Sequence, residues 1–437
     1  MMNMNQSTVT KVQSFNLLLV ILVVVAAGAA FYLLAPPKPQ AHQVTIGAIF
    51  PLSGSDASAG RDVKVAIELA AEIINNEYDL DLPLARTEGL LNLDGAQIHV
   101  IFADSQGDPA IGQAEAERLI NEEQVIALTG AWHSAVTRPA SEAAEISGRP
   151  FICGASTEPA LTARGFTWFF RTTPHDITFS DALLRFAKEM NDTNDLNLKT
   201  VVIVSVDNEW GISAVEAEER FVNEMGFELL ETIYYRSSEI SDASAEALRV
   251  KERNPDILIH NSYTADAILF TQEYKKLNWA PKLFLAQDAG FETAEFLETM
   301  GSDADFIVTR SAWAGLDNKN PRVREVNELY KARHPNGADM DGQTAREFTA
   351  FLVLADAINR AGSTDPEDIR RALAETNWSA EELVTGWEGV KFDTTGQNIK
   401  ATPAMLQRLE GRWRTVWPSE IAPVEAHVPA PNWDQRS

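Results

Sequence analysis

The sequence predicts an α/β protein made of two similar lobes, each a parallel sheet with helices on both faces. From residue 44 onward, short apolar runs alternate with amphipathic stretches of helical spacing, which is the pattern of βαβ units. The pattern restarts after the segment Arg171-Thr-Thr-Pro174, which we interpret as a hinge. The length of 437 residues is sufficient for two such lobes and a tail.

The first lobe is expected to begin at residue 44. Its helix at 59–75 places Val63, Ile67 and Ile74 on one face, as a helix packed against a sheet requires. The expected strands are 44–50, 98–103, 125–128 and 151–153, and the other expected helices are 110–122, 135–147 and 158–164.

The second lobe repeats this order after the hinge. Its expected strands are 201–206, 227–235, 257–260, 282–285 and 307–309, and its expected helices are 181–191, 212–225, 243–253 and 265–277. Residues 321–333, 343–361 and 366–375 then follow as helices, and 390–392 and 402–409 as strands. Because the late helices arrive without matching strands, we expect the chain to return and complete the earlier lobes.

The predicted domain organisation follows from these elements. Lobe 1 is residues 44–173 completed by 312–386, and lobe 2 is residues 174–311 completed by 387–417. The tail at 418–437 contains four prolines and little periodicity, so we expect it to be disordered.

The N-terminal segment indicates the cellular compartment of the protein. Residues 15–35 contain no charged side chain and are long enough to span a bilayer. The same stretch fits a signal peptide, with Ala27-Gly-Ala29 as a cleavage site, and both interpretations remain open. The Pro-rich stretch at 36–43 is expected to be a stiff spacer. We therefore expect the lobes in the periplasm or on the extracytoplasmic face of the membrane, where the N-terminal apolar segment either exports or anchors them.

Composition excludes several classes of function. The net charge of −26 argues against nucleic acid and anionic lipid as partners. The single cysteine, Cys153, excludes an internal disulfide and a cysteine-based zinc site. His133 has no second ligand at metal-binding spacing, so we expect neither metal nor cofactor. The sequence contains no G-x-S-x-G, H-E-x-x-H, P-loop or G-x-G-x-x-G motif, which argues against an enzyme.

Two successive strand ends in the first lobe predict a site for an anionic group. The stretches Gly130-Ala-Trp-His-Ser134 and Phe151-Ile-Cys-Gly-Ala-Ser-Thr157 each break at glycine and offer a hydroxyl before an expected helix. Two neighbouring helix N-termini would present free N–H groups and positive dipole ends to a carboxylate. Ser134 and Thr157 are the hydroxyls placed to complete such a site, although both residue types also serve as ordinary helix N-caps.

Four further motifs carry a resemblance to a known family. They are Ile46-Gly-Ala-Ile-Phe-Pro-Leu-Ser-Gly54, Ala103-Asp-Ser-Gln-Gly-Asp-Pro109, Pro159-Ala-Leu-Thr-Ala-Arg-Gly165 with Phe170-Arg-Thr-Thr173, and residues 386–396. Over residues 44–418 the chain resembles the type I periplasmic solute-binding proteins of ABC importers, in particular the branched-chain amino-acid (Leu/Ile/Val) subfamily. The resemblance implies two doubly wound parallel-sheet lobes joined by a multi-strand hinge, an arrangement known as a Venus flytrap.

The resemblance also implies roles for individual residues. It assigns the ligand carboxylate to Ser134, Ala155 and Thr157, and the ligand ammonium to Tyr263 and Asp288. Trp210 stands where an aromatic side chain closes over the ligand. Trp132 and His133 occupy the wall of the side-chain pocket, where smaller residues are common in the family.

The resemblance leads to a functional expectation with open alternatives. We expect a monomeric, non-enzymatic receptor that binds a small, branched-chain-like amino acid between its lobes and delivers it to an ABC permease of the inner membrane. One alternative keeps the fold but changes the ligand to an amide, urea or a small organic acid. Another alternative is a ligand sensor that uses the same cleft.

Overall fold

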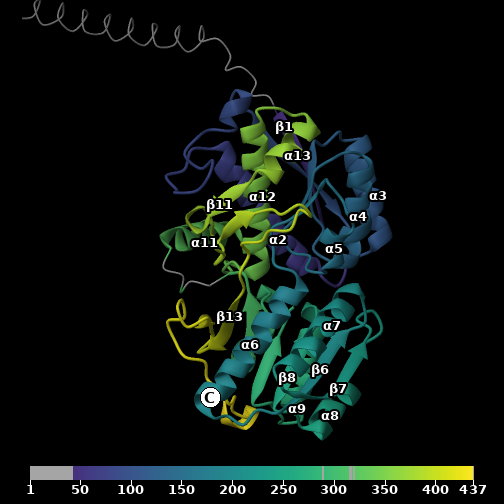
Figure 1. The fold of residues 1–437 in the computed structure, drawn as a ribbon, viewed down its shortest axis with the longest axis vertical. Helices are drawn as coiled ribbons and strands as arrows, with labels where there is room; N and C mark the ends of the chain where they lie inside the picture. Colours follow the sequence, from purple (N-terminus) through teal and green to yellow (C-terminus); the bar gives the residue numbers. More distant parts are fainter. Residues whose placement is uncertain (1–42, 288–289, 314–316, 318–319, 437) are drawn as a thin grey trace, which may run out of the picture. The chain divides into compact units, whose positions relative to one another are not determined.

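A computed structural model describes residues 43–287, 290–313, 317 and 320–436 (Figure 1). The apolar segment at 15–35, the spacer up to residue 42 and Asp288 lie outside these residues. Within them, no helix is both long enough and apolar enough to cross a membrane.

The first lobe is built on a five-stranded sheet with all strands parallel. Its order is β2-β1-β3-β4-β5. The strands are β1 (Gln43–Phe50), β2 (Gln97–Asp104), β3 (Ala127–Gly130), β4 (Phe151–Cys153) and β5 (Phe169–Arg171), and the connecting helices are α2 (Ala57–Asn75), α3 (Pro109–Asn121), α4 (Ser134–Ile146) and α5 (Ala160–Ala163). Strands β1, β3 and β4 are mostly buried, as expected for a sheet covered on both faces.

The second lobe is built on a seven-stranded sheet. Its order is β14-β13-β10-β9-β8-β6-β7, and the five strands from β10 to β7 are parallel. The strands are β6 (Thr200–Val206), β7 (Glu228–Tyr235), β8 (Ile257–Asn261), β9 (Leu283–Ala286), β10 (Ile307–Ser311), β13 (Ala404–Leu409) and β14 (Arg412–Trp417). The helices are α6 (Asp176–Asn194), α7 (Glu209–Glu224), α8 (Ser244–Arg253), α9 (Thr264–Lys276) and α10 (Ala294–Met300).

The parallel parts of the two sheets have the same topology. Numbered within its own lobe, each set of five strands runs in the order 2-1-3-4-5. Strand order therefore reverses once in each lobe, between β1 and β3 and again between β6 and β8. In open parallel sheets, ligands bind beyond the carboxyl ends of the strands at such a reversal. The predicted α/β architecture of two parallel-sheet lobes is confirmed.

The late helices return to the first lobe, as the sequence predicted. Helices α11 (Pro321–Arg333) and α12 (Gly342–Ala361) pack on α2, and α13 (Pro366–Ala374) packs on α12 (Figure 1). Helix α12 begins with a capping box, in which the Asp341 side chain accepts from the Thr344 N–H at 2.7 Å, and it ends at Gly362 in the left-handed conformation. Most of its side chains are buried, so it is a core element of this lobe.

The predicted hinge segment pairs with a second crossing segment. The Arg171 N–H donates to Gly396 O at 2.8 Å, and the Asn398 N–H donates to Arg171 O at 2.9 Å. The Gln397 and Asn398 side-chain amides donate to the carbonyls of Thr173 and Thr172, each at 2.9 Å. These bonds place the chain that enters the second lobe beside the chain that re-enters it.

Several short strands were not predicted. Strand β5 overlaps the motif Phe170-Arg-Thr-Thr173, and β11 (Asn377–Ser379) pairs with β12 (Gly389–Lys391), the strand expected at 390–392, in a separate two-stranded sheet. Strand β14 forms an antiparallel hairpin with β13 around Glu410-Gly411, both of which have positive φ. A two-residue loop between two segments in which apolar and polar residues alternate is typical of a hairpin. The sequence-based prediction ended with the first of these two strands.

The C-terminal segment has defined contacts where the sequence predicted disorder. The Trp433 side chain is buried, and its Nε1 donates to Trp279 O at 2.8 Å. The His427 N–H donates to the Gln407 side chain at 2.7 Å. Prolines remove backbone donors from this segment, but an indole and a few side-chain acceptors are enough to attach it to the second lobe.

Candidate functional site

A small cavity lies at the carboxyl ends of both parallel sheets. Its volume is about 30 Å³, and its lining comes from both lobes. The lining residues are Trp132, His133, Ser134, Ala155, Ser156, Thr157, Trp210, Tyr263, Arg310, Gln343 and Arg346. Small-ligand pockets measure roughly 300–1,000 Å³, so a solute enters this cavity only if the lobes move apart.

Every site residue that the sequence predicted, and that the structure describes, lines this cavity. Trp132, His133 and Ser134 follow β3, and Ala155 and Thr157 follow β4. Trp210 and Tyr263 come from the second lobe, after β6 and β8. Asp288, the predicted acceptor for an ammonium group, lies outside the described residues.

The turn after β3 has the predicted form. Ser134 is the first residue of α4 and is almost fully buried. Its Oγ accepts a long hydrogen bond, 3.4 Å, from the N–H of Glu158 in the neighbouring turn. The Ser156 Oγ, which sequence reasoning did not select, donates to Trp132 O at 2.9 Å and fastens the two turns together.

The turn after β4 differs from the prediction. We expected a helix at 158–164, but α5 is a single turn that begins at Ala160, so no helix N-terminus follows Thr157 directly. Pro159 explains the difference, since a proline disfavours helical geometry in the residue before it. The Thr157 carbonyl instead accepts from the N–H of Asp176 at 2.9 Å, which ties this turn to the start of α6.

Aromatic rings from both lobes form one wall of the cavity. The Tyr263 ring centroid lies 5.4 Å from that of Trp132, 5.1 Å from that of His133 and 5.1 Å from that of Trp210. The Tyr263 hydroxyl accepts from the Asn208 side-chain amide at 3.1 Å. Burial raises the pKa of Tyr263 above its ordinary value, so the hydroxyl stays protonated.

His133 is held by a carboxylate. Its Nε2 lies 3.1 Å from Oδ2 of Asp56, and both side chains are buried. The parts of the chain that the structure describes contain no group of three or more histidine, cysteine or acidic residues arranged to hold a metal ion.

Two arginines in the cavity lining were missed by the sequence analysis. Arg310 is the fourth residue of β10, and Arg346 lies in the first turns of α12; both are almost fully buried. Arg310 directly follows the predicted strand 307–309, so the rule that ligands lie beyond strand ends could have selected it. No local sequence pattern could have selected Arg346, because only the packing of α12 brings this residue to the cavity.

Buried acids lie close to the cavity but do not line it within the described residues. Burial raises the pKa of Glu218 to about 7 and that of Glu347 to about 8. Burial also raises the pKa of Asp176. Hydrogen bonds with the side chains of Thr157 and Ser213 and the positive charge of Arg310 act in the opposite direction but are outweighed. Glu347 lies against the turn after β4, where a Cβ added to Gly154 would be 2.8 Å from its Oε2.

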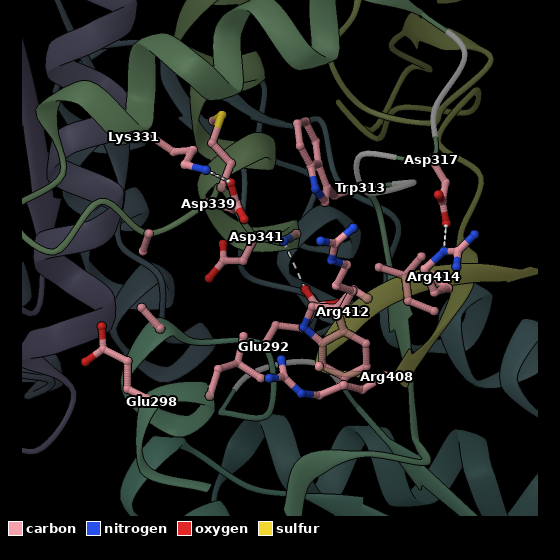
Figure 2. A pocket seen from close by; sticks show the side chains of 18 of the residues that line it. Glu292, Glu298, Trp313, Asp317, Lys331, Asp339, Asp341, Arg408, Arg412 and Arg414 are labelled. Carbon is pink, nitrogen blue, oxygen red and sulfur yellow. Dashed lines mark hydrogen bonds and ion pairs between the residues drawn. The ribbon is translucent and has the colours of Figure 1, made fainter. Parts of the chain in front are cut away.

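A second, larger cavity contains none of the predicted residues. Its volume is about 880 Å³, and Figure 2 shows charged side chains of both signs projecting into it. Several of these charges are paired, with Arg414 at 2.8 Å from Asp317 and Lys331 at 3.1 Å from Asp339. Because the small cavity collects the turns after β3, β4, β6 and β8, we assign the candidate site to it.

Comparison with known proteins agrees with this geometry. The model of the family described as periplasmic binding protein matches residues 43–411. The chain belongs to this family. A curated relative, the Leu/Ile/Val-binding protein homolog 7 of Brucella suis, is 25% identical over 407 residues, covering 91% of this chain and 97% of the relative.

Solved structures share the fold of this periplasmic binding protein. A branched-chain amino-acid transporter substrate-binding protein of Streptococcus pneumoniae, in complex with isoleucine, has a TM-score of 0.72 at 20% identity, covering 86% of this chain and all of the other. An ABC transporter solute-binding protein of R. palustris, in complex with benzoate, has a TM-score of 0.73 at 17% identity, covering 89% and 98%. These relatives are solute-binding proteins and not enzymes, as the sequence predicted for this chain.

Proposed function

We propose that this periplasmic binding protein captures a small, carboxylate-bearing solute between its lobes and delivers it to an ABC permease. The observation that carries the proposal is the cavity at the carboxyl ends of both sheets, lined by residues from each lobe. A ligand that contacts both lobes stabilises the closed arrangement over the open one, and a permease distinguishes the two by shape.

The proposed lobe boundaries follow the strand orders, except that β12, within 387–417, pairs with β11 of lobe 1. Residues 44–173 with 312–386 form lobe 1, and residues 174–311 with 387–417 form lobe 2. Within the site, the Ser134 hydroxyl and the backbone of Ala155 and Thr157 face the ligand carboxylate from lobe 1. Trp210 and Tyr263 close over the ligand from lobe 2, and Asp288 is proposed as the acceptor for an ammonium group of the ligand.

Two ligand classes remain candidates. A branched-chain-like amino acid is supported by the curated relatives and by the isoleucine complex of a fold neighbour. A small organic acid is supported by the benzoate complex of another neighbour. We propose that the protein works as a monomer on the extracytoplasmic face, exported or anchored by residues 15–35, and a sensor role would use the same cleft.

The experiment that tests the proposal is identification of the retained solute. Full-length protein is purified without added ligand and denatured, and the released small molecules are identified by mass spectrometry. We expect one carboxylate-bearing solute, close to one molecule per chain. Calorimetry with that solute should show weaker binding to Ser134→Ala, by about three- to ten-fold for one lost hydrogen bond.

The control for this test is on the same helix. Ser147 is exposed at the other end of α4, so Ser147→Ala should bind the solute as the parent protein does. Equal binding by all three proteins would show that the solute does not occupy the cavity and would contradict the proposal.

A further inference from the structure

Three buried polar atoms at one wall of the cavity have no hydrogen-bond partner among the residues that the structure describes. They are Nε1 of Trp132, Nδ1 of His133 and Oδ1 of Asp56. Trp132 and His133 line the cavity, and the three residues are only 5%, 8% and 7% exposed. Buried polar groups of folded proteins are almost always paired, so unpaired ones at a binding site indicate a ligand that pairs with them.

The three residues form one patch, which we call the polar wall. Trp132 and His133 are neighbours after β3, and their ring centroids lie 4.4 Å apart at an interplanar angle of 83°. Asp56 joins them through Oδ2, which lies 3.1 Å from Nε2 of His133. The rings of Trp132 and His133 lie 5.4 Å and 5.1 Å from that of Tyr263 in the second lobe, so the polar wall lies where the lobes meet.

The pairing of Asp56 with His133 determines which hydrogen bonds the polar wall offers. A carboxylate oxygen accepts, so Nε2 of His133 donates to it, and Nδ1 is an acceptor in the neutral form of the ring. Oδ1 of Asp56 is a second acceptor, and Nε1 of Trp132 is a donor. Two acceptors and one donor match a carboxamide of a ligand in full and a hydroxyl in part, whereas a methyl group matches none of them.

Two acidic side chains increase the preference for a ligand group that donates. Asp56 directly precedes α2 in lobe 1, and Asp266 lies in α9 of lobe 2. Burial raises the pKa of Tyr263, and the charges of Asp56 and Asp266 add to this increase. Negative charge from both lobes therefore acts where the polar wall meets Tyr263, and it favours an N–H or O–H group of the ligand there.

We propose that the solute carries, besides its carboxylate, a distal hydroxyl or carboxamide that forms hydrogen bonds with the polar wall. This inference rests on the proposed function and names the class of its ligand, a small polar carboxylate in place of a branched-chain-like one. An aliphatic group at the same position leaves the three atoms unpaired in the closed protein. Sites built to bind a polar group discriminate strongly against analogues that lack it.

The test uses pairs of compounds that have nearly the same shape and differ in the distal group. Threonine is paired with valine, asparagine with leucine, and 4-hydroxybenzoate with 4-methylbenzoate. Calorimetry on the full-length protein should show that the polar member of at least one pair binds at least about ten-fold more tightly than its apolar counterpart. The first two pairs distinguish a hydroxyl from a carboxamide, and the third covers solutes without an ammonium group.

Variants locate this discrimination at the polar wall. Trp132→Phe removes the N–H donor and keeps a ring, and His133→Phe removes both imidazole nitrogens. Each should reduce the preference for the polar compound about three-fold or more, a change in selectivity that a purely structural role does not produce. Trp168→Phe, at a half-buried tryptophan that is not among the lining residues, is the matched control and should keep the preference of the parent protein.

Two measurements keep the test independent of folding defects. Melting without ligand shows whether each variant is folded, and the comparison within each pair on the parent protein does not depend on any variant. A preference for the polar compounds that survives unchanged in folded Trp132→Phe and His133→Phe would overturn the assignment to the polar wall.

The remaining outcomes separate the inference from the proposed function. Equal or tighter binding of the apolar member in every pair that binds would overturn the inference and leave the proposed function standing. If none of the compounds binds, the solute retained on purification decides. A retained carboxylate without a distal hydroxyl or carboxamide would overturn the inference alone, and the absence of any retained solute would count against both.

Discussion

Arg138 on α4 forms an ion pair with Glu209 on α7, and this contact joins the two lobes beside the cavity. Arg138 also pairs with Glu158 at 2.9 Å, so one guanidinium bridges the turn after β4 and the second lobe. Ser134, at the start of α4, and Trp210, next to Glu209, both line the cavity. The ion pair therefore belongs to the closed arrangement of the lobes, because separation of the lobes breaks it.

Removal of this ion pair should favour the open protein. Arg138 and Glu209 are each about one-third exposed, and pairs of this kind contribute about 0–1 kcal/mol. Glu209→Gln should therefore weaken binding of the retained solute by up to about five-fold and raise the radius of gyration of the unliganded protein in X-ray scattering.

A matched control separates this effect from a general change of charge. Asp181→Asn removes the exposed partner of Arg185 within α6, an ion pair inside a single helix. This variant should change neither the affinity for the retained solute nor the radius of gyration in X-ray scattering. If Glu209→Gln behaves in the same way, the pair does not contribute to closure.

The Tyr263 ring should matter more for binding than its hydroxyl does. Tyr263→Ala removes the ring contacts with Trp132 and Trp210 and should weaken solute binding about ten-fold or more in calorimetry. Tyr263→Phe loses only the hydrogen bond from Asn208 and should weaken it less than about five-fold. Tyr234→Ala, an exposed tyrosine of β7, is the control and should leave affinity unchanged. A larger loss for Tyr263→Phe than for Tyr263→Ala would contradict the stacking role.

Glu347 should make the protein less stable as pH rises. Burial raises its pKa in the folded protein to about 8, above the ordinary value near 4.5. Between these two values the unfolded chain loses a proton that the folded protein retains, so the free energy of unfolding decreases with increasing pH in this window. The decrease is about 1.4 kcal/mol for each unit between the two pKa values, as an upper bound for one group.

The glutamine variant removes this titration. Thermal melting from pH 4.5 to 8.5 should show a flatter decline for Glu347→Gln than for the parent, and a higher melting temperature at the alkaline end. Glu218 titrates in the same direction in both proteins, so the difference between the two curves isolates Glu347. Glu325→Gln, on an exposed face of α11, should follow the parent curve. Parallel curves for the parent and Glu347→Gln would refute the assignment.

Gly396 should be essential for the hinge. Its φ is +78°, and an added Cβ would lie 2.1 Å from Phe169 O, beside the strand that enters the hinge. Gly396→Ala should therefore lower the free energy of unfolding by about 2 kcal/mol or more, through left-handed strain and a backbone clash together. Chemical denaturation measures this loss.

Gly165 provides the control that separates strain from the clash. Its φ is +73°, but an added Cβ would meet no atom within 4 Å. Gly165→Ala should cost about 1 kcal/mol from backbone conformation alone. Equal losses at the two glycines would show that close packing at the hinge contributes nothing.

The sequence by itself determined most of the local structure and half of the site. Alternation of apolar runs with amphipathic stretches located the parallel strands, the breaks after β3 and β4 located Ser134 and Thr157, and the family resemblance added Trp210 and Tyr263. These inferences succeed because strand and helix periodicities are local, and because ligands of parallel sheets lie at strand ends.

Only the tertiary structure decided what closes the cavity. Arg346 reaches it from a helix that returns to the first lobe about 170 residues after the hinge, and Arg138 reaches Glu209 across the cleft. Pro159 shortened α5 and removed a predicted helix N-terminus from the turn after β4. Contacts between residues far apart in the chain depend on how whole elements pack, and no local pattern encodes them.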